Sequence, residues 1–242
     1  GGELSCNGQC SGHAHVPSHP AAPFTLKNKR VYNMKYTLVF SMLGLCLAYL
    51  AAGSAGIYAG ISWYGAVNLF FLAAVYGLRN PYLLGKRPDG RLALLPCLLN
   101  LPWLTLSYVT WLLQSRLSRE PATNEVPGED LVIGRRLLPS EYPDGIDAVI
   151  DLTSELPERH GRVGYIAFPM LDGVAPRTDV FEQVRQVTRG LEGKRVYVHC
   201  AQGHGRTALF CSIMLAIRNG VSTGAAYERL LEVRPRARMS RE

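Results

Sequence analysis

The sequence predicts an α/β protein in which N-terminal transmembrane helices precede a domain built on a central, mostly parallel sheet flanked by helices. Three observations support this fold class. Long apolar runs without charge are confined to residues 36–113. From residue 131 onward, short runs rich in Val and Ile alternate with patterns of helical spacing, which is typical of a parallel α/β sheet. A glycine-punctuated loop over residues 200–206 joins one such strand to the next helix.

Residues 1–35 are predicted to form a flexible polar tail. The segment is rich in Gly, Pro and Ser, and such segments bury too little apolar surface to fold. Two cysteines and three histidines have a spacing that a metal ion could use, at Cys6, Cys10, His13, His15 and His19. The composition favours the flexible tail over a metal site, and no metal ligands are assigned.

Residues 36–114 are predicted to form a membrane region with two or three hydrophobic helices. The runs 36–60 and 62–78 carry no charge, and 92–113 is a third apolar run. About twenty apolar residues span a bilayer as a helix, and aromatic residues lie near the ends of these runs, as they do at membrane interfaces. Buried helices of a soluble domain are the alternative. That alternative is disfavoured because two uncharged runs follow each other across one short turn.

The basic residues beside the apolar runs predict the orientation. They lie before the first run at Lys27, Lys29, Arg30 and Lys35, and between the second and third at Arg79, Lys86, Arg87 and Arg91. The positive-inside rule places both groups in the cytoplasm, so the first two runs form a hairpin. The third run is interrupted by Pro96, Asn100 and Pro102, which favours a segment that re-enters or lies in the interface. We therefore expect an integral membrane protein with a cytoplasmic C-terminal domain; a third run that crosses would place that domain outside.

The charge distribution indicates a membrane partner and no nucleic acid. The formal net charge is +7, and the basic excess lies in and beside the apolar runs. Basic residues in this position set topology and attract anionic lipid. The sequence contains no basic sheet motif with interleaved aromatic residues, so no nucleic-acid partner is expected.

Residues 115–130 are predicted to be a polar linker to a catalytic domain over residues 131–242. Strands are expected at 131–137 and 146–152, from residue 164 to the loop at 172, and at 196–198. Helices are expected at 181–191, 207–219 and 222–233, the last of them capped by Ser222 with Thr223. The run from Thr153 to Glu155 also indicates a helix start.

The loop from Cys200 to Arg206 carries the most informative motif. Its backbone N–H groups and the N-terminus of the following helix suit a tetrahedral dianion. The planar guanidinium of Arg206 matches two phosphate oxygens, and the positive surroundings favour the thiolate form of Cys200, which makes it a nucleophile. The predicted phosphate-binding residues are Ala201, Gln202, Gly203, His204, Gly205 and Arg206.

The pattern H-C-x5-R-T over residues 199–207 resembles the signature of the cysteine-dependent protein tyrosine phosphatases, especially the dual-specificity class. The alternative is a buried thiol followed by an ordinary turn. The resemblance extends over residues 131–242. It implies a dual-specificity-phosphatase-like fold and a phosphocysteine intermediate, with no cofactor or metal, because the loop supplies the positive charge. It also implies that Thr207 helps the thiolate leave and that His199 orders the loop and tunes the thiol.

Asp172 is the predicted general acid. A hydrophobic run ends in a loop that carries this carboxylate between Leu171 and Gly173, and phosphate-ester cleavage needs an acid for the departing oxygen. The resemblance implies an acid of this kind on a movable loop upstream of the nucleophile. Asp179 is the alternative, but its position before Val180 suits a helix cap.

Three functions are consistent with these residues. The first is a membrane-anchored phosphatase of phosphoproteins on Tyr or Ser/Thr. The second is a phosphatase of a lipid phosphomonoester, of a phosphatidylglycerophosphate-like or phosphoinositide-like kind. Lipid-directed members of the family often carry Lys within the loop, and here Ala201, Gln202 and His204 stand at those positions, which weakens the argument for highly charged inositol phosphates. The third is a pseudophosphatase that only binds phosphate, against which the intact Cys200, Arg206 and Asp172 argue.

Overall fold

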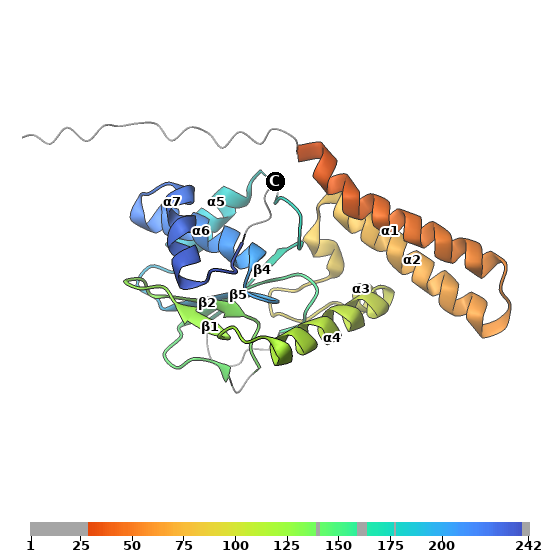
Figure 1. The fold of residues 1–242 in the computed structure, drawn as a ribbon, viewed down its shortest axis with the longest axis horizontal. Coiled ribbons are helices and arrows are strands. Elements are labelled where there is room, and N and C mark those ends of the chain that lie inside the picture. Colours follow the sequence, from red (N-terminus) through yellow and green to blue (C-terminus); the bar gives the residue numbers. More distant parts are fainter. Residues whose placement is uncertain (1–28, 139–140, 159–163, 177, 239–242) are drawn as a thin grey trace, which may run out of the picture.

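The computed structural model describes residues 29–138, 141–158, 164–176 and 178–238. It contains a long helical hairpin and an α/β domain, with shorter helices between them (Figure 1). The cysteines and histidines of the predicted N-terminal tail lie outside the described residues.

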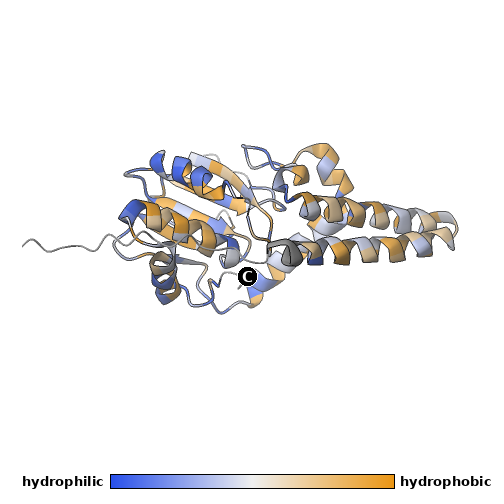
Figure 2. Ribbon diagram, turned by 90° about the horizontal axis from the view of Figure 1, so that it is seen from above, coloured by the Kyte–Doolittle hydropathy of each residue, from blue (hydrophilic) through white to orange (hydrophobic). Residues whose placement is uncertain are grey.

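The helical hairpin consists of α1 (Lys29–Ala52) and α2 (Gly56–Leu78). Two stretches are long and apolar enough to cross a membrane, Met34–Ala52 and Gly56–Leu78. Many apolar side chains of the hairpin are exposed. Hydrophobic residues recur along the length of both helices (Figure 2). The prediction of two membrane-length helices is therefore confirmed by length and composition, while their orientation in a bilayer stays a prediction.

The third apolar run forms two shorter helices, α3 (Leu94–Leu99) and α4 (Leu101–Leu117), joined at Asn100. They contain 6 and 17 residues, fewer than the roughly twenty that a spanning helix needs. The buried Asn100 side chain accepts a hydrogen bond from Asn68 of α2 at 3.0 Å and donates one to the Pro96 carbonyl at 2.9 Å. An amide thus holds the break against α2. Whether the run re-enters or lies in the interface stays a prediction.

The α/β domain is built on a five-stranded sheet of order β1-β2-β5-β3-β4. Only β1 pairs antiparallel, and the other strands pair parallel, as predicted. The strands are β1 (Thr123–Glu125), β2 (Leu131–Arg135), β3 (Ala148–Thr153), β4 (Gly164–Met170) and β5 (Val196–Cys200). The short strand β1 was not predicted, and it lies in the stretch interpreted as a polar linker.

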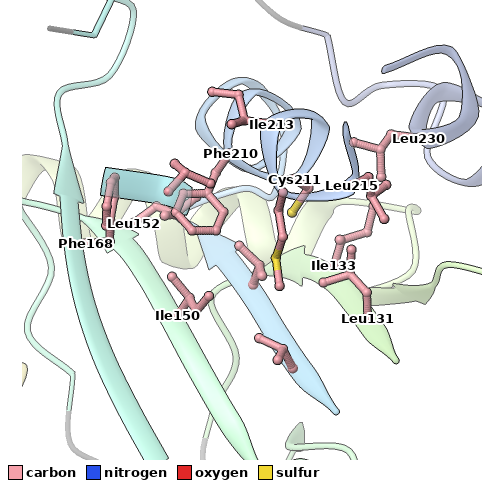
Figure 3. Packing of buried hydrophobic residues seen from close by; sticks show 14 of the residues in the cluster. Leu131, Ile133, Ile150, Leu152, Phe168, Phe210, Cys211, Ile213, Leu215 and Leu230 are labelled. Atoms are coloured by element: carbon pink, nitrogen blue, oxygen red, sulfur yellow. The ribbon is translucent and has the colours of Figure 1, made fainter. Parts of the chain in front are cut away.

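Three helices gather over one face of the sheet: α5 (Val180–Arg189), α6 (Gly205–Asn219) and α7 (Thr223–Val233) (Figure 1). The core lies between them and the strands. Side chains of α6 such as Phe210 and Cys211 point toward Ile150 and Ile133 (Figure 3). The central helix is therefore buried on nearly all sides, which fixes the loop at its N-terminus.

The predicted helix start at Thr153 is wrong. Strand β3 ends at Thr153, and bends follow it instead of a helix. The Thr153 hydroxyl lies near the Asp151 carboxylate and the Leu156 carbonyl, and the Glu155 carboxylate binds Arg206. These tertiary contacts replace the helix cap that the local sequence indicates. By contrast, Ser222 caps α7 as predicted, since its hydroxyl accepts from the Ala225 N–H at 3.1 Å.

Candidate active site

The carbonyl groups of the loop after β5 accept hydrogen bonds from residues outside the loop. The Cys200 and Ala201 carbonyls accept from the Arg136 N–H at 2.8 and 3.2 Å. The Gln202 and Gly203 carbonyls accept from the Arg234 guanidinium at 3.2 and 3.0 Å. Four successive carbonyls are thereby engaged with the surrounding protein. The first N–H groups of α6 have no intrahelical partner, so this loop offers donors for an anion at the N-terminus of a helix.

Gly203 allows this loop to pack directly against β2. It adopts φ of +70°, and a Cβ added there would overlap the backbone of Gly134. A side chain at Gly134 would in turn overlap the Ala122 carbonyl and Thr123 of β1. Gly203 and Gly134 therefore allow the loop, β2 and β1 to pack against one another at short distance.

Arg206, the predicted phosphate-binding residue, is fixed by a carboxylate that the sequence did not reveal. Its two terminal nitrogens donate to the Glu155 oxygens at 2.9 and 2.8 Å, and one also donates to the Met170 carbonyl at 3.2 Å. Burial alone would raise the pKa of Glu155, but the Arg206 charge and hydrogen bonds outweigh it and hold this pKa below its ordinary value. Among the described residues, Arg206 Nε is buried without a hydrogen-bond partner. This nitrogen faces the Asp172 carboxylate in an ion pair at 3.4 Å, so a ligand oxygen would compete with that carboxylate for it.

Asp172, the predicted acid, lies beside Arg206. One carboxylate oxygen is 3.4 Å from Arg206 Nε, and the side chain is 70% exposed. The alternative acid, Asp179, stands at the N-terminal boundary of α5, where its carboxylate accepts from Gln183 at 2.9 Å. Among the described contacts of the two aspartates, the one with Arg206 belongs to Asp172, and this favours Asp172 as the acid.

Of the other predicted residues, Cys200 and His204 belong to the loop, and His199 and Thr207 flank it. Cys200 is almost fully buried at the end of β5, and both it and the core residue Cys211 are free thiols. His199 and Thr207 are fully buried, and within the described part of the chain His199 Nε2 and Thr207 Oγ1 have no hydrogen-bond partner. The His204 ring nitrogen lies 2.8 Å from Glu120. The structure thus brings all five predicted catalytic residues to one end of the sheet.

Aromatic residues of the membrane hairpin line the edge of the site. Tyr36 of α1 lies against Gly173, where an added Cβ would overlap the Tyr36 hydroxyl. Tyr76 of α2 is buried close enough to Arg206, Glu155 and Asp172 to interact with their charges. Leu171 belongs to the same apolar cluster as Tyr76, and Val174 packs against that cluster. The loop that carries Asp172 therefore packs against α1 and α2 of the helical hairpin.

Sequence reasoning missed the residues that hold the site from a distance. Glu155 and Arg234 stand 51 and 31 positions from the groups that they bind, Arg206 and Gly203. Burial lowers the pKa of Arg234, although nearby Glu120 opposes that effect. In the sequence, Glu155 and Arg234 are visible only as charged residues next to apolar runs. A charged residue in such a place does not show which group it binds.

One buried cluster has the composition of a metal site. Ligand atoms of Asp151, Glu158 and His199 lie within 4.8 Å of one another. The ammonium group of Lys86 donates to Asp151 at 2.6 Å and already supplies a positive charge there. We therefore assign no metal to this cluster.

A cavity of about 160 Å³ lies between the 3-10 helix η1 (Pro81–Leu84) and α5. It adjoins residues 171–176, the loop that carries Asp172 and is called the acid loop below. Its walls include Phe168, Leu171 and Val174, and neither Cys200 nor Arg206 lines it. It therefore receives no role in phosphate binding.

The α/β domain is similar to solved dual-specificity and tyrosine-phosphatase-like structures. Human DUSP28 is 20% identical over 50% of this chain and 87% of its own, with a TM-score of 0.43. Tk-PTP in the active form is 26% identical over 50% of this chain and 90% of its own, with a TM-score of 0.43. PTPMT1 in complex with PI(5)P is 15% identical over 50% and 88%, with a TM-score of 0.44. No protein-family model and no curated protein sequence matches the chain.

Proposed function

We propose that this chain is a cysteine-dependent phosphatase that hydrolyses phosphomonoesters through a phosphocysteine intermediate, with its catalytic domain in the cytoplasm. One observation carries the proposal. Four carbonyls of the loop from Cys200 are tied to Arg136 and Arg234, while Arg206 keeps one buried donor beside Asp172. This arrangement supports the binding of a phosphate dianion next to a thiol and an acid.

The proposed reaction has two displacements at phosphorus. In the first, the Cys200 sulfur bonds to phosphorus as the bond to the ester oxygen breaks, and that oxygen takes the proton of Asp172. In the second, water attacks phosphorus, Asp172 takes a proton from the water, and the sulfur–phosphorus bond breaks to release inorganic phosphate. Arg206 and the loop N–H groups stabilise the three other oxygens. The hydroxyl of Thr207 is buried without a hydrogen-bond partner among the described residues, and in this mechanism it donates to the sulfur as the thiolate leaves.

The position of the site favours lipid headgroups over phosphoproteins as substrates. Tyr36 lies two residues after Met34, where the first candidate span begins, and Tyr76 lies two before Leu78, where the second ends. Both contact or face the acid loop. Because tyrosines of this kind lie at headgroup level, a bilayer places the mouth of the site beside lipid phosphates. A phosphoprotein would have to bring its phosphorylated residue along the membrane surface.

A comparison of substrates tests the chemistry and the substrate class separately. Full-length protein is assayed for phosphate release from phosphatidylcholine vesicles containing a phosphatidylglycerophosphate or phosphatidic acid, from phosphopeptides, and from a soluble aryl phosphate. We expect hydrolysis of the vesicle lipid with a higher kcat/KM than any phosphopeptide. The opposite ranking would assign the protein to phosphoproteins.

Two variants test the roles of the residues. Cys200→Ser should release no phosphate from any substrate, and near-wild-type release would exclude the phosphocysteine route. Asp172→Ala should slow hydrolysis of an alkyl phosphate by roughly 10²–10⁴-fold, because its leaving group needs a proton, and should affect a good aryl leaving group less. Asp179→Ala is the matched control, and a larger loss in that variant would move the acid role to Asp179.

A further inference from the structure

A lysine from the membrane-proximal region is buried beneath the catalytic loop. Lys86 lies in a turn between η1 and α3, which is closed by a bridge between Lys86 and Leu92. Its side chain is fully buried, although an ammonium group is rarely buried without partners. It donates to the Asp151 carboxylate at 2.6 Å and to the Leu156 carbonyl, and it lies 3.4 Å from the Thr153 hydroxyl.

The turn that carries Lys86 is docked closely on the α/β domain. Its tip, Gly90, accepts a hydrogen bond from the Glu158 N–H at 2.9 Å. Gly90 has φ of +80°, and a Cβ there would press on the Glu158 carbonyl and the Tyr165 ring. The position of Lys86 is therefore set by the backbone of the turn as well as by its own hydrogen bonds.

The partner of Lys86 faces the residue that precedes the nucleophile. Asp151 is fully buried, and its carboxylate also accepts from Tyr165 at 2.8 Å and from the Thr153 N–H at 2.8 Å. The same carboxylate lies 4.0 Å from His199 Nδ1. That ring nitrogen is 3.4 Å from the Cys200 carbonyl. A line of buried groups thus leads from the membrane-proximal turn to the catalytic loop.

The charges around His199 act in opposite directions. Burial is the largest effect and lowers the pKa of His199, the carboxylates of Asp151 and then Glu158 raise it, and Lys86 lowers it again. Burial would raise the pKa of Asp151, but His199 and Lys86 outweigh burial and hold it low. The charged and titratable groups facing His199 come from the turn, β3, the segment after β3 and β5, and they are Lys86, Asp151, Glu158, Tyr197 and Cys200.

We propose that Lys86 is a positioning residue of the active site, which neutralises Asp151 so that His199 stays uncharged behind Cys200. Without the ammonium group, the imidazole of His199 is the base, among the described groups around Asp151, that can take up a proton and supply a positive charge. A protonated His199 donates from Nδ1 to Asp151 and leaves the Cys200 carbonyl. The inference rests on the proposed function of Cys200, but its first test does not depend on turnover.

The first test measures His199 directly. The full-length protein in detergent micelles is labelled with ¹⁵N-histidine, and His199 is identified by its loss in His199→Gln. We expect a neutral ring at pH 7 in the wild type. In Lys86→Met, protonation should begin roughly one pH unit higher, because an opposite charge near the carboxylate is lost. A wild-type His199 that is charged at pH 7 would overturn the proposal even if the variant does not fold.

The second test uses the pH profile of kcat/KM on a soluble aryl phosphate. Lys86→Met should move the acidic limb to higher pH, and the double variant Lys86→Met with Asp151→Asn should move it back, since both charges are then absent. Arg91→Met is the matched control, because it removes an exposed cation from the same turn. A purely structural lysine would lower stability without moving the limb, and an unmoved limb in a folded Lys86→Met protein would contradict the proposal. Loss of all activity in wild type as well as variants would instead contradict the proposed function.

Discussion

Helices α1 and α6 are both rich in apolar residues, and their surroundings differ completely. In α6, nearly every side chain from Arg206 to Ala216 is buried between the sheet and its neighbouring helices. In the candidate span of α1, only 17% of the most apolar window is buried. Apolar sequence is thus covered by the protein's own core in one region and left uncovered in the other, where its length is that of a membrane span.

The boundary between the two regions is nevertheless not a simple linker. Lys86 enters the α/β domain from one side, and Tyr36 and Tyr76 reach the acid loop from another. From α4, the buried Trp111 donates to the Arg136 carbonyl at 3.3 Å and lies under the Arg136 guanidinium. The N-terminal helical region therefore packs on the α/β domain at several points.

Removal of the membrane region should have the largest effect. A protein that begins at residue 118 should lose roughly 10²–10⁴-fold in activity on vesicle lipid, because it no longer gains from a high local substrate concentration. Phosphate release from vesicles and from a soluble aryl phosphate is compared with that of the full-length protein. The soluble activity should fall as well, because Lys86 is missing. Unchanged soluble activity would show that the two regions are independent.

The substitution Asp151→Asn sharpens this comparison, because it should lower the free energy of unfolding of the full-length protein and raise that of the shortened protein. In the full-length protein it leaves Lys86 without its carboxylate and should destabilise the fold. In the shortened protein, studied at a pH where His199 is neutral, it removes a buried charge that has lost its cation, and it should raise the free energy of unfolding. Breaking a buried pair costs roughly 3–5 kcal/mol, which chemical denaturation easily resolves. The same sign in both proteins would contradict the pairing.

Gly203→Ala should disrupt the catalytic region alone. Ala is strained at positive φ and would also overlap Gly134, so we expect a loss of activity and of more than about 2 kcal/mol of stability. Gly193→Ala is a matched control, because Gly193 has φ of +69° and open space around it. It carries the backbone strain without the overlap. Equal thermal destabilisation in the two variants would mean that the contact with β2 is unimportant.

Gly173→Ala should disturb the contact between the regions. The new methyl group overlaps the Tyr36 hydroxyl and displaces the loop that carries Asp172. A displacement of this size should slow turnover roughly 10- to 100-fold. Adding Tyr36→Ala should restore part of the rate, because space is created for the loop. If the second substitution has no effect, the loss comes from backbone strain at Gly173 and not from Tyr36.

Asn100→Leu should have a smaller effect, confined to the membrane-proximal region. It removes the acceptor for Asn68 and the bond to Pro96, so we expect a loss of about 1–3 kcal/mol in stability. Thermal unfolding in detergent measures the loss, and turnover of a soluble substrate by the folded fraction should be unchanged. An equal fall in that turnover would show that the break in the third run also positions the catalytic domain.

The smallest effect is expected from the pH dependence of Glu155. Its pKa is lower in the folded protein than the ordinary 4.5, so the stability it contributes is present above that pH and is lost as the pH falls below it. Denaturation midpoints of the wild type should therefore fall more steeply below about pH 4.5 than those of Glu155→Gln. Parallel curves would mean that the Glu155–Arg206 pair contributes little.

The sequence predicted what depends on neighbours along the chain. The motif around Cys200, the parallel strands and the cap at Ser222 rest on local patterns, and the structure has each of them. Lys86 was interpreted only as a topology signal, because its partner Asp151 stands 65 positions away. Glu155 was interpreted as a helix start for the same reason. An ion pair between residues far apart in the chain produces no periodicity and no fixed spacing, so the sequence pattern does not reveal it.

The turn between α1 and α2 has a consequence for how the protein enters a membrane. It consists of Gly53, Ser54 and Ala55, none of which carries a charge. Ser54 donates to the Leu50 carbonyl and so satisfies part of the helix end from within. Insertion of the hairpin as one unit would move no formal charge through the hydrocarbon and do no work against the membrane potential. In the orientation proposed above, the segment between the two helices that reaches the far side of the bilayer would be these three small residues.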